Sequence, residues 1–102
     1  MIKLSMDKFK EEKHGIYVFL IKDCWVCNDY IKELEQNFPK SETWNSIDCD
    51  EDLTYIVDEL KLDDIPMTRL YDKGVMVWEK SGILYSTQRD ELYNKISERL
   101  GT

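Results

Sequence analysis

A CxxC pair placed directly after the longest apolar run is the feature that most constrains this chain. The run at residues 16–21, IYVFLI, is rich in β-forming side chains and is typical of a strand covered on both faces. The next residues include DCWVC, in which Cys24 and Cys27 are separated by two positions. Pro39 then ends a stretch of apolar residues at helical spacing: Cys27, Tyr30, Ile31, Leu34 and Phe38. We therefore expect Cys24 at the junction between a buried strand and a helix.

A cysteine at such a junction is suited to thiol–disulfide exchange. The first turn of a helix has free backbone N–H groups and the positive end of the helix dipole, and both stabilise a thiolate. The thiolate is the nucleophile of the exchange, and CxxC cysteines so placed have a pKa below the free value of about 8.5. Cys27 follows one turn later, where its sulfur can release a mixed disulfide by bonding to Cys24.

Two other interpretations of the CxxC stay open on the residues alone. A structural zinc site needs four ligands, commonly from two such pairs. Here the remaining candidates are Cys49 and His14, which do not form a ligand spacing that we recognise. The third interpretation is two packed thiols at this spacing by chance. The strand expected before the pair and the helix expected after it favour the redox dithiol.

Length and charge limit the class of protein and the partners. A chain of 102 residues is expected to form a single domain, 1–102, with a modest core. The net charge of −7 argues against nucleic acid or an anionic membrane as main partner, because both are bound by basic patches. No stretch of the sequence approaches the roughly 20 apolar residues of a membrane span. The acidic surface favours a monomer.

The N-terminal sequence and the cysteine count bear on the compartment. MIKLSMDKFKEEKHG lacks the apolar segment of about 7–15 residues that a signal peptide contains, so we expect a cytoplasmic protein. Thiols in that compartment are kept reduced, and structural disulfides are rare. An odd number of cysteines, three, also fits a disulfide scaffold poorly. We expect the third, Cys49, to be a packed or partly exposed free thiol.

The other expected elements alternate between strands and helices. Strands are predicted at 1–4, 43–48, 67–71 and 75–79, and the last two flank DKG, a hairpin signal. A short helix is predicted at 7–13. This order of elements implies a three-layer α/β fold with both parallel and antiparallel strands.

Two further helices are predicted in the second half of the chain. Asp50 is expected to cap the first of them, with an apolar face made of Leu53, Ile56, Val57 and Leu60. Thr87 and Asp90 resemble a capping box for the second. The apolar face of this last helix consists of Leu92, Tyr93, Ile96 and Leu100.

Four features in order along the chain carry a family resemblance. They are the CxxC, then Ser46-Ile47-Asp48, then Ile65-Pro66 before the apolar strand at 67–71, and finally DKGVMVWEKSG. Together they resemble the thioredoxin branch of the thioredoxin-like superfamily, over about residues 9 to 100. The resemblance implies a thioredoxin-like three-layer α/β/α fold with a mixed central sheet of four to five strands.

The resemblance also implies an activity and the roles of the site residues. The chain would be a protein-disulfide reductase, with Cys24 as the attacking thiol and Cys27 as the resolving thiol. Pro66 would follow a cis peptide bond, and the backbone of Ile65 would pair with an extended substrate segment. The residues between the cysteines, Trp25 and Val26, would contact substrate at the rim, although Trp25 also fits a plain surface aromatic.

Partners follow from the same resemblance. It implies protein disulfides as substrates and a flavin reductase like thioredoxin reductase as electron source, because the sequence has no cofactor motif of its own. We expect no cofactor and no metal. The glutathione-binding pattern of glutaredoxins is not evident, which favours protein disulfides over glutathione mixed disulfides. The alternative is a thioredoxin-fold binding or adaptor subunit in which the dithiol is incidental.

Three positions depart from the thioredoxin pattern. Val18 stands where thioredoxins usually have a buried acid, and Trp44 stands where they often have a lysine. Without that acid, the resolving thiol Cys27 should have a high pKa. Asp23 replaces the usual tryptophan before the first cysteine, and its negative charge should raise the pKa of Cys24. We therefore expect a moderately activated Cys24 and a poor oxidant.

Overall fold

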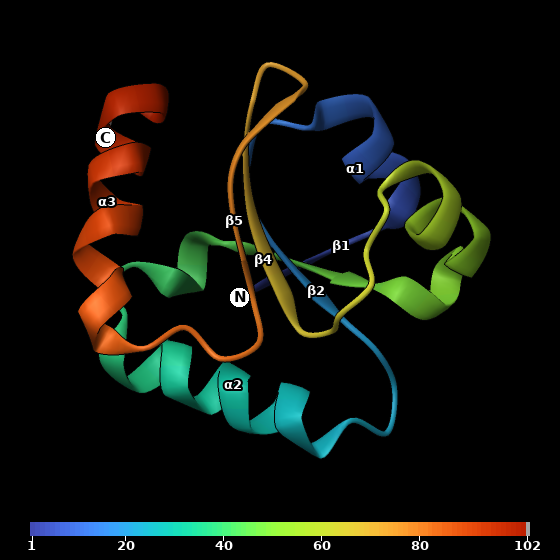
Figure 1. Ribbon diagram of the computed structural model, residues 1–102, viewed down its shortest axis with the longest axis horizontal. Coiled ribbons are helices and arrows are strands. Elements are labelled where there is room, and N and C mark those ends of the chain that lie inside the picture. Colours follow the sequence, from blue (N-terminus) through green and yellow to red (C-terminus); the bar gives the residue numbers. More distant parts are fainter. Residues whose placement is uncertain (102) are drawn as a thin grey trace.

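The computed structural model describes residues 1–101, except for the side chain of Ser86, and shows one sheet between two helical layers (Figure 1). Its five strands lie in the order β1-β3-β2-β4-β5. β1, β3 and β2 are parallel, whereas β4 is antiparallel to β2 and β5 is antiparallel to β4. Their bounds are Ile2–Leu4, Gly15–Leu20, Asn45–Asp48, Met67–Asp72 and Val75–Ser81 for β1 to β5.

The helices cover both faces of this sheet. In Figure 1, α2 (Trp25–Asn37) and α3 (Ser86–Leu100) lie on one side of the strands, below and to the left. α1 (Met6–Glu12) lies on the other side. The shorter helical segments are η1, η2 and the π-helical turn η3, with bounds Ser41–Thr43, Cys49–Glu51 and Tyr55–Glu59. The predicted three-layer fold and mixed sheet are confirmed.

β2 is the central strand, as its apolar run predicts. Successive side chains of a strand point to opposite faces of the sheet. Tyr17 and Phe19 accordingly pack into the core cluster under α1, and Ile16 and Val18 into the cluster under α2 and α3. None of these four side chains is more than 5% exposed. Both faces of β2 are therefore covered.

The helix predicted after Asp50 is present, but most of it is a π-helical turn and only half of its predicted apolar face is buried. The segment forms the 3₁₀ turn η2 and the π-helical turn η3, in which the Leu60 N–H bonds to the carbonyl of Tyr55 at 3.0 Å. This wider turn loses the 3.6-residue periodicity on which the prediction rested. Ile56 and Leu60 are buried, but Leu53 and Val57 are 48% and 57% exposed.

The capping predictions in this half of the chain are also wrong. Asp50 does not cap η3: its carboxylate accepts the backbone N–H of Lys22 at 2.8 Å. α3 begins at Ser86 with Tyr85 as the N-cap, so Thr87 already lies in the first turn. Leu84, two residues before this helix, is fully buried. The predicted strand at 43–48 likewise starts later, because η1 takes up its first residue.

Paired substitutions in η3 test which of its side chains are buried. We expect Ile56→Ala to lower the free energy of unfolding by about 2–5 kcal/mol, because Ile56 is 1% exposed in the core. Val57→Ala should change it by less than about 0.5 kcal/mol, because Val57 lies at the surface. Urea denaturation of both variants measures the difference. Equal losses would mean that 53–60 pack as the regular helix that the sequence pattern predicts.

Candidate functional site

Cys24 is the N-cap of α2, at the strand–helix junction where its sequence position predicts it. Its backbone is extended, with φ −110° and ψ 102°, and its Sγ accepts the backbone N–H of Cys27 at 3.1 Å. The two cysteines form a disulfide, with their Cα atoms 5.2 Å apart. An N–H that points at this sulfur also stabilises a thiolate in the reduced state, together with the helix dipole.

The two cysteines differ in exposure. Cys24 is half-buried, whereas Cys27 is only 2% exposed. Between them, Trp25 is 74% exposed at the surface and Val26 is half-buried. Cys24 is therefore the more accessible of the two cysteines.

The Ile65-Pro66 peptide bond is cis, as expected. Pro66 directly precedes β4, whose first residue Met67 pairs with Phe19 near the end of β2. The cis bond and the loop that leads to Cys24 therefore leave the sheet at the same edge. Pro66 is buried, and its carbonyl accepts the N–H of Gly82 at 2.8 Å.

Buried Arg69 fixes the segment that leads to the cis bond. Its guanidinium donates to the carbonyl of Leu60 at 2.9 Å and to the hydroxyl of Tyr71 at 3.0 Å. Its Nε–H also donates to the carboxylate of Glu79 at 3.0 Å. The segment from Leu60 to the cis bond is thus tied at its start to the middle of β4.

The architecture matches solved thioredoxins over almost the whole chain. The thioredoxin of Malassezia sympodialis superposes with a TM-score of 0.69 at 18% identity, covering 97% of this chain and 90% of that one. Plasmodium falciparum thioredoxin superposes with a TM-score of 0.69 at 18% identity, covering 96% of this chain and 98% of that one. Chloroplastic thioredoxin z superposes with a TM-score of 0.69 at 21% identity, covering 96% of this chain and 95% of that one. The chain has the thioredoxin-like fold. No protein-family model and no curated protein matches it.

Val18 and Trp44, two of the positions that depart from the thioredoxin pattern, lie in the apolar part of the layer between the helices α2 and α3 and the sheet. Val18 is fully buried and Trp44 is 4% exposed, and both belong to the same core cluster. The expected replacement of a buried ionic pair by apolar groups is therefore consistent with the packing. Burying a lone charge in this layer would be costly, so the loss of both partners together is physically reasonable.

A buried pair of hydroxyl groups lies between α2 and the sheet and was not predicted from the sequence. The hydroxyls of Tyr30 and Thr68 are 2.7 Å apart, and both side chains are fully buried. Tyr30 lies one helical turn after Cys27, and Thr68 pairs with Val18 across the sheet. Burial raises the pKa of Tyr30 to about 12, partly offset by the hydrogen bond. The signal available in the sequence was a threonine, Thr68, within an apolar predicted strand.

Removing one hydroxyl of the pair should destabilise the protein. Tyr30→Phe or Thr68→Val leaves the other hydroxyl buried without its partner, at a cost of about 1–3 kcal/mol each. The double variant should lose less than the sum of the two, because no orphaned hydroxyl remains. Urea denaturation of the reduced protein measures the cycle, with Thr54→Val at an exposed position as the control. Strict additivity would contradict a direct hydrogen bond.

The two other zinc candidates lie away from the CxxC. Cys49 is fully buried in the core cluster under α1, on the opposite face of the sheet from α2. His14 precedes β2, whereas Cys24 follows its far end, and the Nδ1 of His14 accepts the backbone N–H of Lys73 at 3.1 Å. Among residues 1–101, no three His, Cys, Asp or Glu side chains come together as a metal site.

Cys49 should be unreactive in the folded protein. Burial raises the pKa of its thiol to about 12, and the charges of Asp48 and Asp50 add to this effect. Since the thiolate is the reactive form, the thiol should not react until the pH approaches that value or the core opens. With reduced protein at pH 8, we expect two thiols to be consumed by Ellman's reagent within minutes: Cys24 reacts first, and Cys27 then displaces the reagent from it as the disulfide closes. A third thiol should react only in denaturant.

The matched control for this thiol count is Cys49→Ser, which should keep the two fast thiols and lose the slow one. A third fast thiol in the native wild type would show that Cys49 is accessible.

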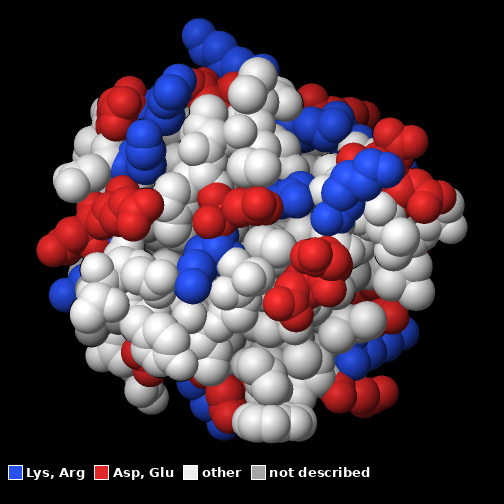
Figure 2. Space-filling view, viewed as in Figure 1, with Lys and Arg blue, Asp and Glu red and all other residues white. Residues whose placement is uncertain are grey.

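The visible surface shows no large patch of one charge. Figure 2 shows Lys and Arg interspersed with Asp and Glu over this face of the molecule. No helix in the described part of the chain combines the length and apolar character needed to cross a bilayer.

Proposed function

We propose that this chain is a thiol–disulfide oxidoreductase that reduces protein disulfides with the Cys24–Cys27 dithiol. The observation that carries the proposal is the placement of the pair. The Cys24 sulfur lies at the N-terminus of α2, where it accepts an N–H at 3.1 Å, while Cys27 is shielded beneath it at 2% exposure. This division suits an attacking thiol and a resolving thiol.

The reaction consists of two exchanges. The Cys24 thiolate attacks one sulfur of the substrate disulfide, forms a mixed disulfide and releases the other sulfur as a thiolate, which takes up a proton. Cys27 then loses its proton and attacks the Cys24 sulfur, which expels the second substrate sulfur. The substrate disulfide gains two electrons and two protons, and the dithiol is oxidised to the Cys24–Cys27 disulfide.

Cys27 must lose its proton without a fully buried acid beside it, and a small cavity that the half-buried Asp48 also lines supports a route for this proton. The cavity, of about 240 Å³, is lined by Cys27 and by polar side chains that include Lys3, Ser46 and Asp48. A water molecule occupies about 30 Å³ in the liquid, so several fit in this polar space. Water in this cavity would take the place of the carboxylate as the first proton acceptor.

The remaining predicted site residues have binding roles in this proposal. Trp25 and Val26 contact the substrate at the rim beside Cys24, which the exposed indole of Trp25 supports. The backbone of Ile65, next to Pro66, pairs with an extended substrate segment. A flavin reductase of the thioredoxin-reductase type supplies electrons, and a reducing compartment such as the cytoplasm suits the cycle.

A redox titration tests this function. Wild type and Cys49→Ser are equilibrated in dithiothreitol buffers, alkylated and read by intact mass. We expect a two-electron change confined to Cys24 and Cys27 at about −230 to −280 mV, the range of glutaredoxins and thioredoxin. A potential above about −180 mV, the value of protein disulfide isomerase, would contradict a reductase. If no intramolecular disulfide forms at any potential, the redox function is wrong.

A further inference from the structure

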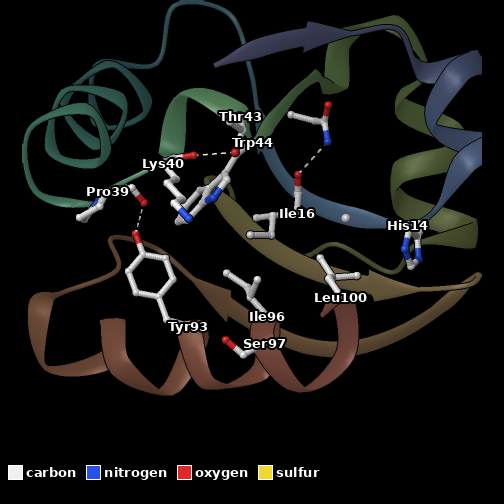
Figure 3. Close-up of a pocket in the computed structure, with 12 residues that line it drawn as sticks. His14, Ile16, Pro39, Lys40, Thr43, Trp44, Tyr93, Ile96, Ser97 and Leu100 are labelled. Atoms are coloured by element: carbon white, nitrogen blue, oxygen red, sulfur yellow. Dashed lines mark hydrogen bonds between the residues drawn. The ribbon is translucent and has the colours of Figure 1, made fainter. Parts of the chain in front are cut away.

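A cavity of about 630 Å³ opens at the edge of the sheet opposite the CxxC (Figure 3). It lies where β2 and β3 begin, whereas Cys24 follows the far end of β2. One wall is α3, from Tyr93 to Leu100, and the other is the segment 39–45. Small-molecule sites typically have volumes of about 300–1,000 Å³, so the size suits a small organic ligand.

The interior of this cavity is apolar and partly aromatic. Ile16, Ile96 and Trp44 line it, and each is less than 10% exposed. Figure 3 shows the side chains of Ile96 and Leu100 pointing from α3 toward Ile16. The rings of Trp44 and Tyr93 lie edge-to-face at 6.4 Å between centroids. These surfaces suit a flat apolar ligand, which can pack against ring faces and edges.

Hydrogen bonds hold the two walls in place. The Tyr93 hydroxyl donates to the carbonyl of Pro39 at 2.6 Å, and the Arg89 guanidinium donates to the carbonyl of Asn37 at 2.8 Å. Both bonds join α3 to the chain that follows α2. The cavity is therefore formed by elements tied together without a ligand, which lowers the entropy cost of binding.

The charges around the cavity favour an anion. Its lining includes the Lys40 ammonium but no Asp or Glu, although the chain has 21 acidic and 14 basic residues. Outside the lining, the charges of Arg89 and Glu42 act in opposite directions on the Tyr93 hydroxyl.

At the His14 end, the imidazole Nδ1 accepts the Lys73 backbone N–H, and the Asp72 carboxylate is paired with the Arg99 guanidinium at 3.9 Å. In the part of the chain that the structure covers, no carboxylate is within ion-pair distance of the Lys40 ammonium.

We propose that this cavity binds a small aromatic carboxylate. Its ring packs against Trp44 and Tyr93, and its carboxylate pairs with the Lys40 ammonium, which lies beside Trp44 in Figure 3. This binding site is separate from the dithiol and goes beyond the redox function. Its existence does not depend on whether Cys24 and Cys27 cycle.

A pair of matched ligands tests the proposal. 2-Naphthoate is titrated into the ¹⁵N-labelled protein, and 2-naphthamide serves as a neutral ligand of the same shape. We expect saturable one-to-one binding of naphthoate that shifts the indole N–H resonance of Trp44 and leaves that of Trp25 in place. Naphthamide should bind about three- to tenfold more weakly, because it lacks the charge that pairs with Lys40.

Matched variants locate the charge and the cavity. Lys40→Gln should weaken naphthoate binding about three- to tenfold and leave naphthamide binding unchanged. Lys61→Gln is the control, because Lys61 is also exposed with a positive φ, 57° against 70° for Lys40, but does not line the cavity. Leu100→Trp fills part of the cavity and should weaken both ligands.

The proposal is overturned by any of three results. They are the absence of saturable naphthoate binding, equal affinities for the two ligands, and equal effects of Lys40→Gln and Lys61→Gln. The reduction potential of Lys40→Gln should equal that of wild type, so the outcome here is independent of the redox titration.

Discussion

Cys24→Ser is expected to abolish catalysed reduction of a protein disulfide. A serine hydroxyl is not ionised at neutral pH and cannot form the mixed disulfide, so the catalysed rate should fall by about 10³-fold or more. The assay is the reduction of insulin by dithiothreitol, with the rate compared to that of dithiothreitol alone. Loss of the protein's contribution would place the first exchange at the half-buried sulfur that caps α2.

Cys27→Ser should stop the same reaction one step later. The first exchange can still occur, but no second thiol is present to release the substrate from Cys24. Incubation with a peptide disulfide should therefore give a stable adduct in the intact mass spectrum, which excess dithiothreitol removes. Cys49→Ser, the control, should behave as wild type because that thiol is buried in the core. Full activity of Cys24→Ser would favour the adaptor alternative, in which the dithiol is incidental.

Phe9→Ala should cause a large loss in the free energy of unfolding. Phe9 is fully buried, and its ring lies 4.8 Å from Tyr17, 5.4 Å from Phe19 and 5.3 Å from Tyr71 between centroids, all edge-to-face. Removing such a ring leaves a cavity and costs about 3–5 kcal/mol. Because the free energy of unfolding of a native protein is about 5–15 kcal/mol, this loss is a large share of the total stability. Urea denaturation measures the loss.

Two further variants serve as controls for Phe9→Ala. Phe9→Leu keeps most of the apolar volume and should retain a clear part of the stability. Ile2→Ala, at a side chain 51% exposed, should change the free energy of unfolding by less than about 0.5 kcal/mol. A loss below about 1 kcal/mol for Phe9→Ala would mean that α1 does not hold this ring in the core.

The elements that the sequence predicts well are those encoded by adjacent residues. The apolar run of β2, the helical spacing of α2 and the position of Cys24 between them are local patterns, and the structure bears them out. The hairpin at DKG is equally local, because Lys73 and Gly74 both have positive φ, 50° and 89°, as a tight two-residue turn requires. The order of these elements was enough to indicate the mixed sheet.

Contacts between distant segments were decided only by the tertiary structure. Tyr30 and Thr68 are 38 positions apart, and neither residue alone indicates that their hydroxyls meet beneath the CxxC helix. η3 is a π-helical turn that buries Ile56 and Leu60 but leaves Leu53 and Val57 exposed, a division that the local periodicity does not predict.

The cavity beside Lys40 also depends on contacts between distant segments of the chain. Its walls come from segments that meet only when α3 closes over the start of β2 and β3. Local patterns are set by the geometry of neighbouring peptide units, and sequence therefore determined the strand, the helix and the cysteine between them. Buried polar pairs and cavities depend on which surfaces the folded chain brings together, and so only the tertiary structure decided them.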